Sequence, residues 1–372
     1  MRSRNLAAGA IVATATLTTG ALPAGADPAP SPPQAPLKDN TRSFDLVKPS
    51  GHPVVLRNAP RKLSVTYTYE GKKHTLDDFL ARTNTQGFVV LDGQKVVMEK
   101  YNFAARDTRF QSWSMAKSFT SAAFGIALNE GLIHSIDDPV TRYLPELRGS
   151  GYDGVSLRNL LRMSSGIAWT ETFSVPPVHV AASLGYPLTK LAAQQKRGWK
   201  PGSKFEYTSM NSFVLSWVVS RVAKMPFHRF VQEKLWKPGG MESTVYLGND
   251  SNGDNMGYCC FYATDRDFAR FGLLYLRGGK ANGHQVVPAS WVKQSTRPSA
   301  PFNQNYGFQW WLDSDGAFSA QGLAGQHIYV SPRYGVVIVK STLATVVGDE
   351  ESDAAFDAVA AEVARTRRAA AH

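Results

Sequence analysis

Short apolar runs flank glycine-containing turns near both ends of this chain. Residues 88–91 and 95–99 are largely apolar and lie on either side of Asp92-Gly93, and residues 326–330 and 336–340 flank a turn-forming segment. An Asp-Gly pair between such runs is typical of a tight β-hairpin. We therefore predict two hairpins whose strands, from both ends of the chain, pair in one antiparallel sheet.

Apolar positions with helical spacing lie between and after these hairpins. The run from Ser114 to about Glu130 is small and apolar on most sides, which predicts a central, buried helix that stops at Gly131. A final helix is expected from about Asp353, with one apolar face. That face consists of Phe356, Val359, Ala360 and Val363.

The middle of the chain, residues 131–255, is expected to be mostly helical with long loops. The apolar helices predicted there are 155–161, 211–222 and 226–236. A capping box at 264–267 then opens a further helix. The fold class expected is α/β of the α+β kind, an antiparallel sheet flanked by helices. Residues 39–130 and 256–372 would form its α/β domain, with residues 131–255 as a mostly helical inserted domain.

The first 26 residues have the pattern of a secretory signal peptide. Two arginines precede a weakly apolar stretch at 6–22, and residues 24–26 are small, as a cleavage site requires. A membrane anchor is the alternative, but the stretch is short and broken by Thr and Gly. Residues 27–38 are a proline-rich linker. We expect a secreted protein, extracellular or in the cell envelope after cleavage near Ala26, with no stable membrane insertion.

The chain is basic without a basic block. Its 372 residues carry a formal net charge of +11, or +9 without Arg2 and Arg4. Because Lys and Arg are scattered, nucleic acid is not an expected partner. Weak contact with anionic cell-wall polymers is the interaction that this charge favours, beside a small-molecule substrate.

The two cysteines, Cys259 and Cys260, are adjacent and cannot link distant segments. Two buried thiols are the favoured interpretation, and a vicinal disulfide is the alternative. Their spacing does not suit a zinc site. We expect neither a metal nor a cofactor.

Ser114 and Lys117 are the strongest candidates for chemistry. A serine and a lysine three residues apart share one helix face, and an amine in a desolvated cleft can activate a serine hydroxyl. Ser290 and Lys293 have the same spacing, but Ser290 follows Pro288-Ala289 and is expected to be a helix N-cap. Ser114, at the mouth of a buried helix, is therefore the predicted nucleophile.

Two further segments carry candidate site residues. Tyr207, two residues before Ser209, can shuttle protons beside a lysine, although a structural tyrosine is the simpler interpretation. Gly322 and Gly325 lie before a predicted strand, where substrate can approach the backbone and an N–H can join an oxyanion hole. The aromatic residues Trp310-Trp311, Tyr306 and Trp169 are candidates for lining the cleft, or for the core.

These segments together resemble the serine β-lactamase-like hydrolases, in the class C-type branch. The matching segments are 110–118, 130–133, 137–140, 143–145, 161–166 and 263–267, with Tyr207-Thr208-Ser209 as the second motif. Residues 259–264 and 322–326 are most similar to the subgroup of 6-aminohexanoate-oligomer hydrolases and related esterases. The resemblance covers about residues 60–365 and implies the β-lactamase/transpeptidase fold.

The resemblance also implies roles for individual residues. Ser114 would be acylated, Lys117 would be its base or electrostatic partner, and Tyr207 would shuttle protons. The N–H of Leu323 would join that of Ser114 in the oxyanion hole. Ser209 stands where asparagine is more usual.

The chain also departs from the family pattern. The Lys-Thr-Gly motif corresponds to Ala320-Gln321-Gly322, so the lysine that meets a substrate carboxylate is missing. No deacylation loop with a glutamate of the class A type is recognisable.

Three functional hypotheses follow. The favoured one is a secreted serine hydrolase that cleaves a small amide or ester through an acyl-enzyme on Ser114. A D,D-peptidase or β-lactamase is the alternative enzyme, and a catalytically silent binding protein on the same fold is the alternative from another class.

Overall fold

The computed structural model describes residues 43–250, 252–313, 315–342 and 349–369. The predicted signal peptide and linker lie outside these residues. Within them, no helix combines the length and the apolar composition that crossing a bilayer would require.

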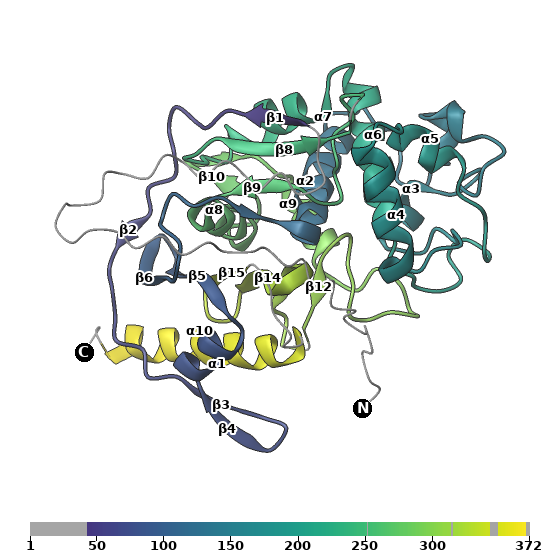
Figure 1. The fold of residues 1–372 in the computed structure, drawn as a ribbon. Helices are drawn as coiled ribbons and strands as arrows, with labels where there is room; N and C mark the ends of the chain where they lie inside the picture. Colours follow the sequence, from purple (N-terminus) through teal and green to yellow (C-terminus); the bar gives the residue numbers. More distant parts are fainter. Residues whose placement is uncertain (1–42, 251, 314, 343–348, 370–372) are drawn as a thin grey trace, which may run out of the picture.

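A seven-stranded sheet contains strands from both the N-terminal and the C-terminal parts of the chain (Figure 1). In spatial order its strands are β12 (Trp311–Leu312), β13 (Phe318–Gly322), β14 (Gln326–Ser331), β15 (Val336–Thr342), β5 (Thr85–Asp92), β6 (Lys95–Tyr101) and β2 (Arg57–Asn58). The predicted hairpins are β5–β6 and β14–β15, and both are confirmed. Strand β15 pairs antiparallel with β5, placing Ile338 opposite Val90, so both ends of the chain do share one sheet.

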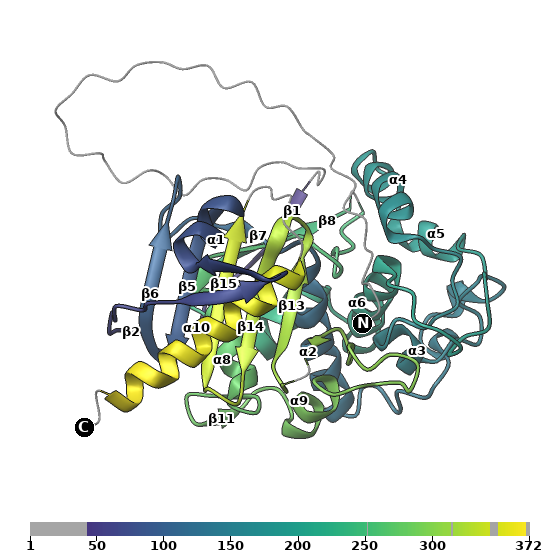
Figure 2. The same ribbon diagram turned by 90° about the horizontal axis from the view of Figure 1, so that it is seen from below.

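Helices cover both faces of this sheet. Helices α1 (Leu76–Arg82) and α10 (Asp349–Ala369) lie on one face and α8 (Asp265–Leu276) lies on the other (Figures 1 and 2). Because strand side chains alternate, Val90 packs in the cluster under α10 while Val89 packs in the cluster under α8. The predicted apolar face of α10 is buried, although the helix begins four residues earlier than Asp353. Thr264 caps α8 as predicted, with its side chain accepting a hydrogen bond from the N–H of Asp267.

The remaining helices gather at one end of the sheet (Figure 2). They are α2 (Ala116–Asn129), α3 (Leu157–Leu161), α4 (Glu171–Ser183), α5 (Leu188–Ala193), α6 (Ser209–Ala223), α7 (Phe227–Phe230), which continues as a π-helix at Val231–Trp236, and α9 (Ala289–Ser295). Helix α2 is buried along nearly its whole length and ends before Gly131, as predicted. Helix α4 was not predicted, because Pro176 and Pro177 lie inside it and proline removes a helical N–H donor.

A smaller sheet leads the chain into α2. Its order is β1 (Ser43–Val47), β8 (Val245–Asn249), β9 (Phe261–Ala263) and β7 (Phe110–Gln111). Strand β7 pairs with β9, which places the start of α2 beside the segment that contains both cysteines. Two short hairpins, β3 (Thr66–Tyr69) with β4 (Lys72–Thr75) and β10 (Lys280–Ala281) with β11 (His284–Gln285), complete the strands of the described residues.

Candidate active site

Ser114 and Lys117 meet at the start of α2. Ser114 lies in a 3₁₀ turn, Trp113–Met115, directly before the helix and not inside it as predicted. The Nζ atom of Lys117 donates a hydrogen bond to Ser114 Oγ at 2.7 Å. Trp113, the residue before the serine, has a φ of 44°, a left-handed conformation that a bulky side chain adopts only when its surroundings impose it.

Lys117 is almost completely removed from solvent. Only 1% of the residue is exposed, and Nζ also donates to the carbonyl oxygen of Tyr258 at 3.2 Å. The ring centre of Tyr207 lies 4.9 Å from Nζ. Burial lowers the pKa of the Lys117 amine from 10.5 to about 8, while the carboxylate of Glu171 opposes this shift. The amine is thus far closer to neutrality at pH 7 than an exposed lysine.

The second motif brings Tyr207 and Ser209 to the same place. Tyr207 precedes α6, and its ring stacks on Trp311 with centres 5.4 Å apart. Ser209 is the first residue of α6, and its hydroxyl donates a hydrogen bond to Glu171. The hydroxyl proton of Ser209 is therefore used in a hydrogen bond to a carboxylate.

Glu171 is a site residue that the sequence analysis missed. One of its oxygens, Oε2, accepts hydrogen bonds from the N–H of Ser209 at 2.9 Å and from Trp169 Nε1 at 2.6 Å. It begins α4, and a carboxylate at the N-terminus of α6 is favourably placed in the helix dipole. No motif contains Glu171, and only the unpredicted helix brings it to the site.

Gly322 and the turn that follows it pack against the residues before Ser114. Gly322 ends β13, and the 3₁₀ turn Leu323–Gly325 follows it. A Cβ atom at Gly322 would lie 2.4 Å from the carbonyl oxygen of Ser112, so only glycine allows this contact. Lys340, on β15, donates a hydrogen bond from Nζ to the carbonyl oxygen of Gly325 at 3.0 Å. This bond holds the turn in place against the sheet. The predicted oxyanion segment is therefore beside the serine, with the Leu323 residue 63% exposed.

The aromatic residues predicted to line the cleft have different positions. Trp169 is buried and donates a hydrogen bond to Glu171, and Tyr306 is also buried. Trp310 is fully buried, and its ring centre lies 4.5 Å from that of Tyr275 and 5.2 Å from that of Phe318. Of the predicted pair, Trp310 is therefore a core residue and not a substrate contact, whereas Trp311 stacks on Tyr207.

The cysteines are buried as expected but are not two thiols. Cys259 and Cys260 form a disulfide, which was the less favoured alternative. Cys260 has a φ of 73°. Next to them, burial lowers the pKa of His179 to about 4, so this imidazole is neutral at pH 7.

The second Ser-x-x-Lys sequence is structurally different. Ser290 and Lys293 are exposed on α9, and Pro288 occupies the N-cap position that was predicted for Ser290. The same spacing therefore occurs once in a desolvated site and once on the surface.

The geometry agrees with comparisons to known proteins. The family model described as Beta-lactamase matches residues 73–362, so this chain belongs to the β-lactamase family. It is a serine hydrolase of that family, and the hypothesis of a silent binding protein is set aside.

The similar proteins include named amide and ester hydrolases. The chain is 32% identical over 294 residues to the 6-aminohexanoate-dimer hydrolase of Paenarthrobacter ureafaciens, covering 71% of this chain and 74% of that protein. A structure from Bacillus anthracis with a provisional assignment to the same activity has a TM-score of 0.77 at 23% identity, covering 87% of this chain and 91% of the other. A family VIII carboxylesterase has a TM-score of 0.58 at 15% identity, covering 74% of this chain and 92% of the other. The latter two matches show the fold.

Proposed function

We propose that this protein hydrolyses a small linear amide or ester through an acyl-enzyme on Ser114, in the manner of the 6-aminohexanoate-dimer hydrolase that it resembles. The observation that carries the proposal is the 2.7 Å hydrogen bond between Ser114 and a buried Lys117. A poor nucleophile is thereby joined to an amine whose neutral form is accessible near pH 7.

The acylation step follows from this pair. The neutral Lys117 amine accepts the Ser114 proton while Oγ bonds to the substrate carbonyl carbon, and the backbone N–H groups of Ser114 and Leu323 stabilise the oxyanion. The proton then passes, with the help of Tyr207, to the leaving amine or alkoxide as its bond to the carbonyl carbon breaks. Water repeats the sequence on the acyl-enzyme, releasing the acid and restoring the Ser114 hydroxyl.

The charges around the site favour a substrate without a carboxylate directly beside its scissile amide or ester bond. Ala320-Gln321-Gly322 offers no ammonium, and Gln321 uses its Nε2 to donate to Ser319 Oγ at 2.9 Å. Two carboxyl groups, Glu171 and Glu206, lie close enough to interact, and their repulsion adds to the burial that raises the pKa of Glu206. A carboxylate-bearing β-lactam or D-Ala-D-Ala peptide would lack a charge-assisted hydrogen bond and would meet negative charge.

The test compares substrates on one preparation. We expect kcat/KM to be higher for p-nitrophenyl butyrate than for nitrocefin, with turnover of a linear 6-aminohexanoate amide. A clear preference for nitrocefin would instead support the β-lactamase alternative.

A covalent label identifies the nucleophile in the same experiment. A fluorophosphonate should modify Ser114, as mapped by mass spectrometry, and Ser114→Ala should abolish labelling. Ser290→Ala is the matched control, because it removes the other Ser-x-x-Lys serine and should leave labelling intact. Label on Ser290, or activity in Ser114→Ala, would contradict the assignment.

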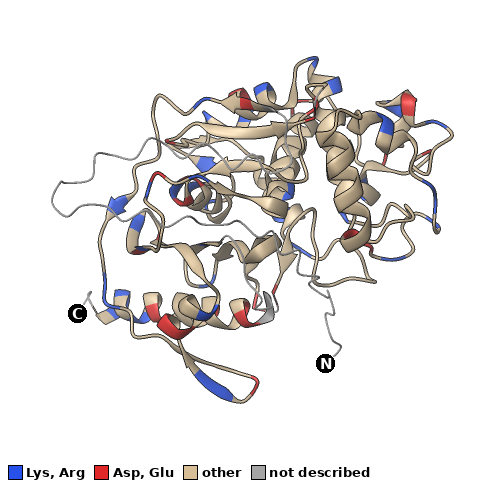
Figure 3. Ribbon diagram, in the orientation of Figure 1, with Lys and Arg blue, Asp and Glu red and all other residues tan. Residues whose placement is uncertain are grey.

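We also propose that the protein is exported after cleavage near Ala26 and makes only weak contact with anionic wall polymers. In support of weak contact, the lysines and arginines of the described residues are spread over many elements and do not gather at one place (Figure 3). N-terminal sequencing of the protein recovered from the culture medium would test export, and a salt-dependent sedimentation assay with wall polymer would test the contact.

A further inference from the structure

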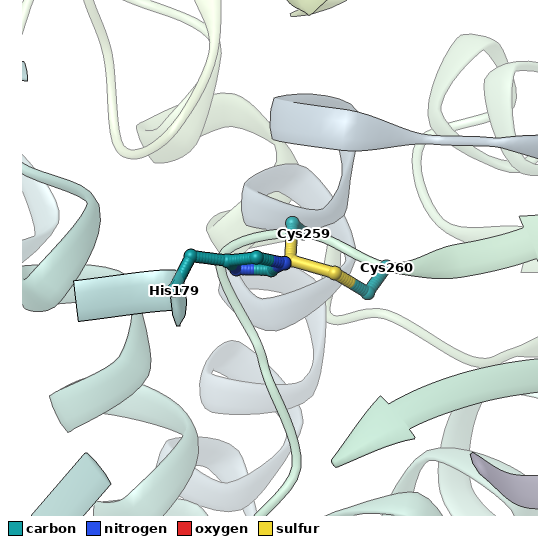
Figure 4. A group of neighbouring side chains, drawn as sticks. All are labelled: His179, Cys259 and Cys260. Carbon is teal, nitrogen blue, oxygen red and sulfur yellow. A yellow bond between two sulfur atoms is a disulfide. The ribbon is translucent and has the colours of Figure 1, made fainter. Parts of the chain in front are cut away.

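A buried cluster of His179, Cys259 and Cys260 lies next to Tyr258, whose carbonyl oxygen accepts a hydrogen bond from Lys117. The cysteines belong to the segment between β8 and β9, and His179 extends toward them from α4 (Figure 4). The three residues are 6%, 4% and 0% exposed. One ligand atom from each, an imidazole nitrogen and two sulfurs, lies within 4.8 Å of the others. None of these side chains has a role in the acylation mechanism.

The imidazole of His179 is oriented with one nitrogen available. Its Nδ1 lies 2.9 Å from the hydroxyl of Tyr258, while its Nε2 is buried without a hydrogen-bond partner among the described residues. A buried, unpaired ring nitrogen is costly unless another group uses it. Histidines that bind metals commonly hold the other ring nitrogen in a hydrogen bond, as Tyr258 does here.

The sulfurs complete a set of soft donors. Two thiolates and an imidazole suit d¹⁰ ions such as Zn²⁺ and Cd²⁺. The thioether of Met256 adds a further soft atom, since its Sδ lies 3.9 Å from Cys260 Sγ. In the disulfide, however, the two sulfurs are bonded to each other and cannot act as thiolates.

We propose that reduction of the Cys259–Cys260 bond opens a Cys₂His site for a thiophilic d¹⁰ metal ion. A dithiol or phosphine reductant supplies two electrons to the S–S bond, and each sulfur takes up one proton. With a phosphine, water provides these protons and the oxygen of the phosphine oxide. The metal ion then replaces both thiol protons, and His179 Nε2 donates its lone pair. The proposal does not depend on the substrate of the serine site.

The experiment uses the full chain and Cd²⁺ as the probe. The protein is reduced with a water-soluble phosphine, freed of reductant under inert gas and titrated with Cd²⁺ by calorimetry and ultraviolet absorption. We expect one ion to bind per chain, with a thiolate-to-cadmium charge-transfer band and release of two protons. Because the chain contains only two cysteines, that band can arise only from this pair. The oxidised protein should show neither binding nor the band.

Variants test each ligand. Cys259→Ser and Cys260→Ser should each lose stoichiometric binding. His179→Ala should weaken Cd²⁺ binding by roughly 10-fold or more. His284→Ala is the control, because His284 is exposed on β11 and should bind as wild type does.

Three results would overturn the proposal. The first is a folded, reduced protein that does not bind Cd²⁺. The second is wild-type affinity in His179→Ala. The third is a chain that unfolds on reduction, by circular dichroism, and does not regain its fold with Cd²⁺.

Discussion

In the proposed mechanism, the basicity of Lys117 sets the pH range in which Ser114 is acylated. Burial places the pKa of its amine at about 8, against an ordinary value of 10.5. At pH 7 about one tenth of the amines are then neutral, compared with about 3 in 10,000 for an exposed lysine. Burial therefore raises the population of the active base about 300-fold at that pH.

The assay must report acylation alone. The second-order rate of fluorophosphonate labelling does so, because the phosphonylated serine does not turn over. Between pH 6 and 10 we expect this rate to rise with pH and to level off above a midpoint near 8. Lys293→Ala should give the same profile, since that lysine is exposed on α9.

Glu171→Gln tests the direction in which the midpoint of the pH profile moves. A glutamine can keep the three hydrogen bonds, with its Oε1 accepting from the Ser209 N–H and Trp169 and its amide group donating to the Ser209 hydroxyl. It removes a negative charge that raises the pKa of Lys117. The midpoint should therefore move to lower pH in this variant.

Two outcomes would refute this reasoning. A labelling rate that continues to rise tenfold per pH unit up to pH 10 would show that the pKa of Lys117 is not lowered. A midpoint that moves to higher pH in Glu171→Gln would show that another group controls the profile.

Three other predictions concern the shuttle, the oxyanion segment and stability. Lys117→Ala and Tyr207→Phe should each lower kcat/KM by roughly 10²–10⁴-fold; a double variant whose loss equals the product of the two would contradict a shared proton path. Gly322→Ala places a Cβ 2.4 Å from a backbone oxygen and should lower kcat by up to about 10²–10³-fold, the effect of losing one oxyanion donor, while Gly51→Ala, where a Cβ meets nothing within 4 Å, should not. Burial raises the pKa of the Asp265 carboxyl to about 7 from 3.8, so the folded state binds this proton more tightly and stability falls as pH rises between those values. Between pH 5 and 8 the free energy of unfolding of the wild type, measured in urea, should fall, and roughly 3 kcal/mol of this fall should be absent in Asp265→Asn. An equal fall in both proteins would show that Asp265 does not titrate as described.

The hairpins and α2 could be predicted because local patterns determine them. Alternating or continuous apolar runs around a turn specify strand pairs, and the cap at Thr264 specifies the start of α8. Serine and lysine three residues apart must be neighbours wherever a helical turn forms. These signals require no knowledge of distant contacts.

The residues that were missed depend on long-range packing. Glu171 and His179 lie on α4, whose two internal prolines argue against a helix from sequence alone. Trp310 lies in the core and Trp311 stacks on Tyr207, although the two residues are adjacent on the chain. Which of two adjacent tryptophans faces the site depends on strand register, and a register shift of one residue reverses the faces.

The two Ser-x-x-Lys sequences show what spacing cannot determine. Both pairs have the same separation, but Lys293 is exposed and Lys117 is 1% exposed. Lys117 loses its hydration, and this burial lowers the pKa of its amine to about 8. Among the residues that surround this amine are Tyr207 and Tyr258, which are 90 and 141 residues away in sequence. The motif therefore places the lysine beside the serine, whereas the fold around it lowers the pKa of the amine to the range that the proposed base requires.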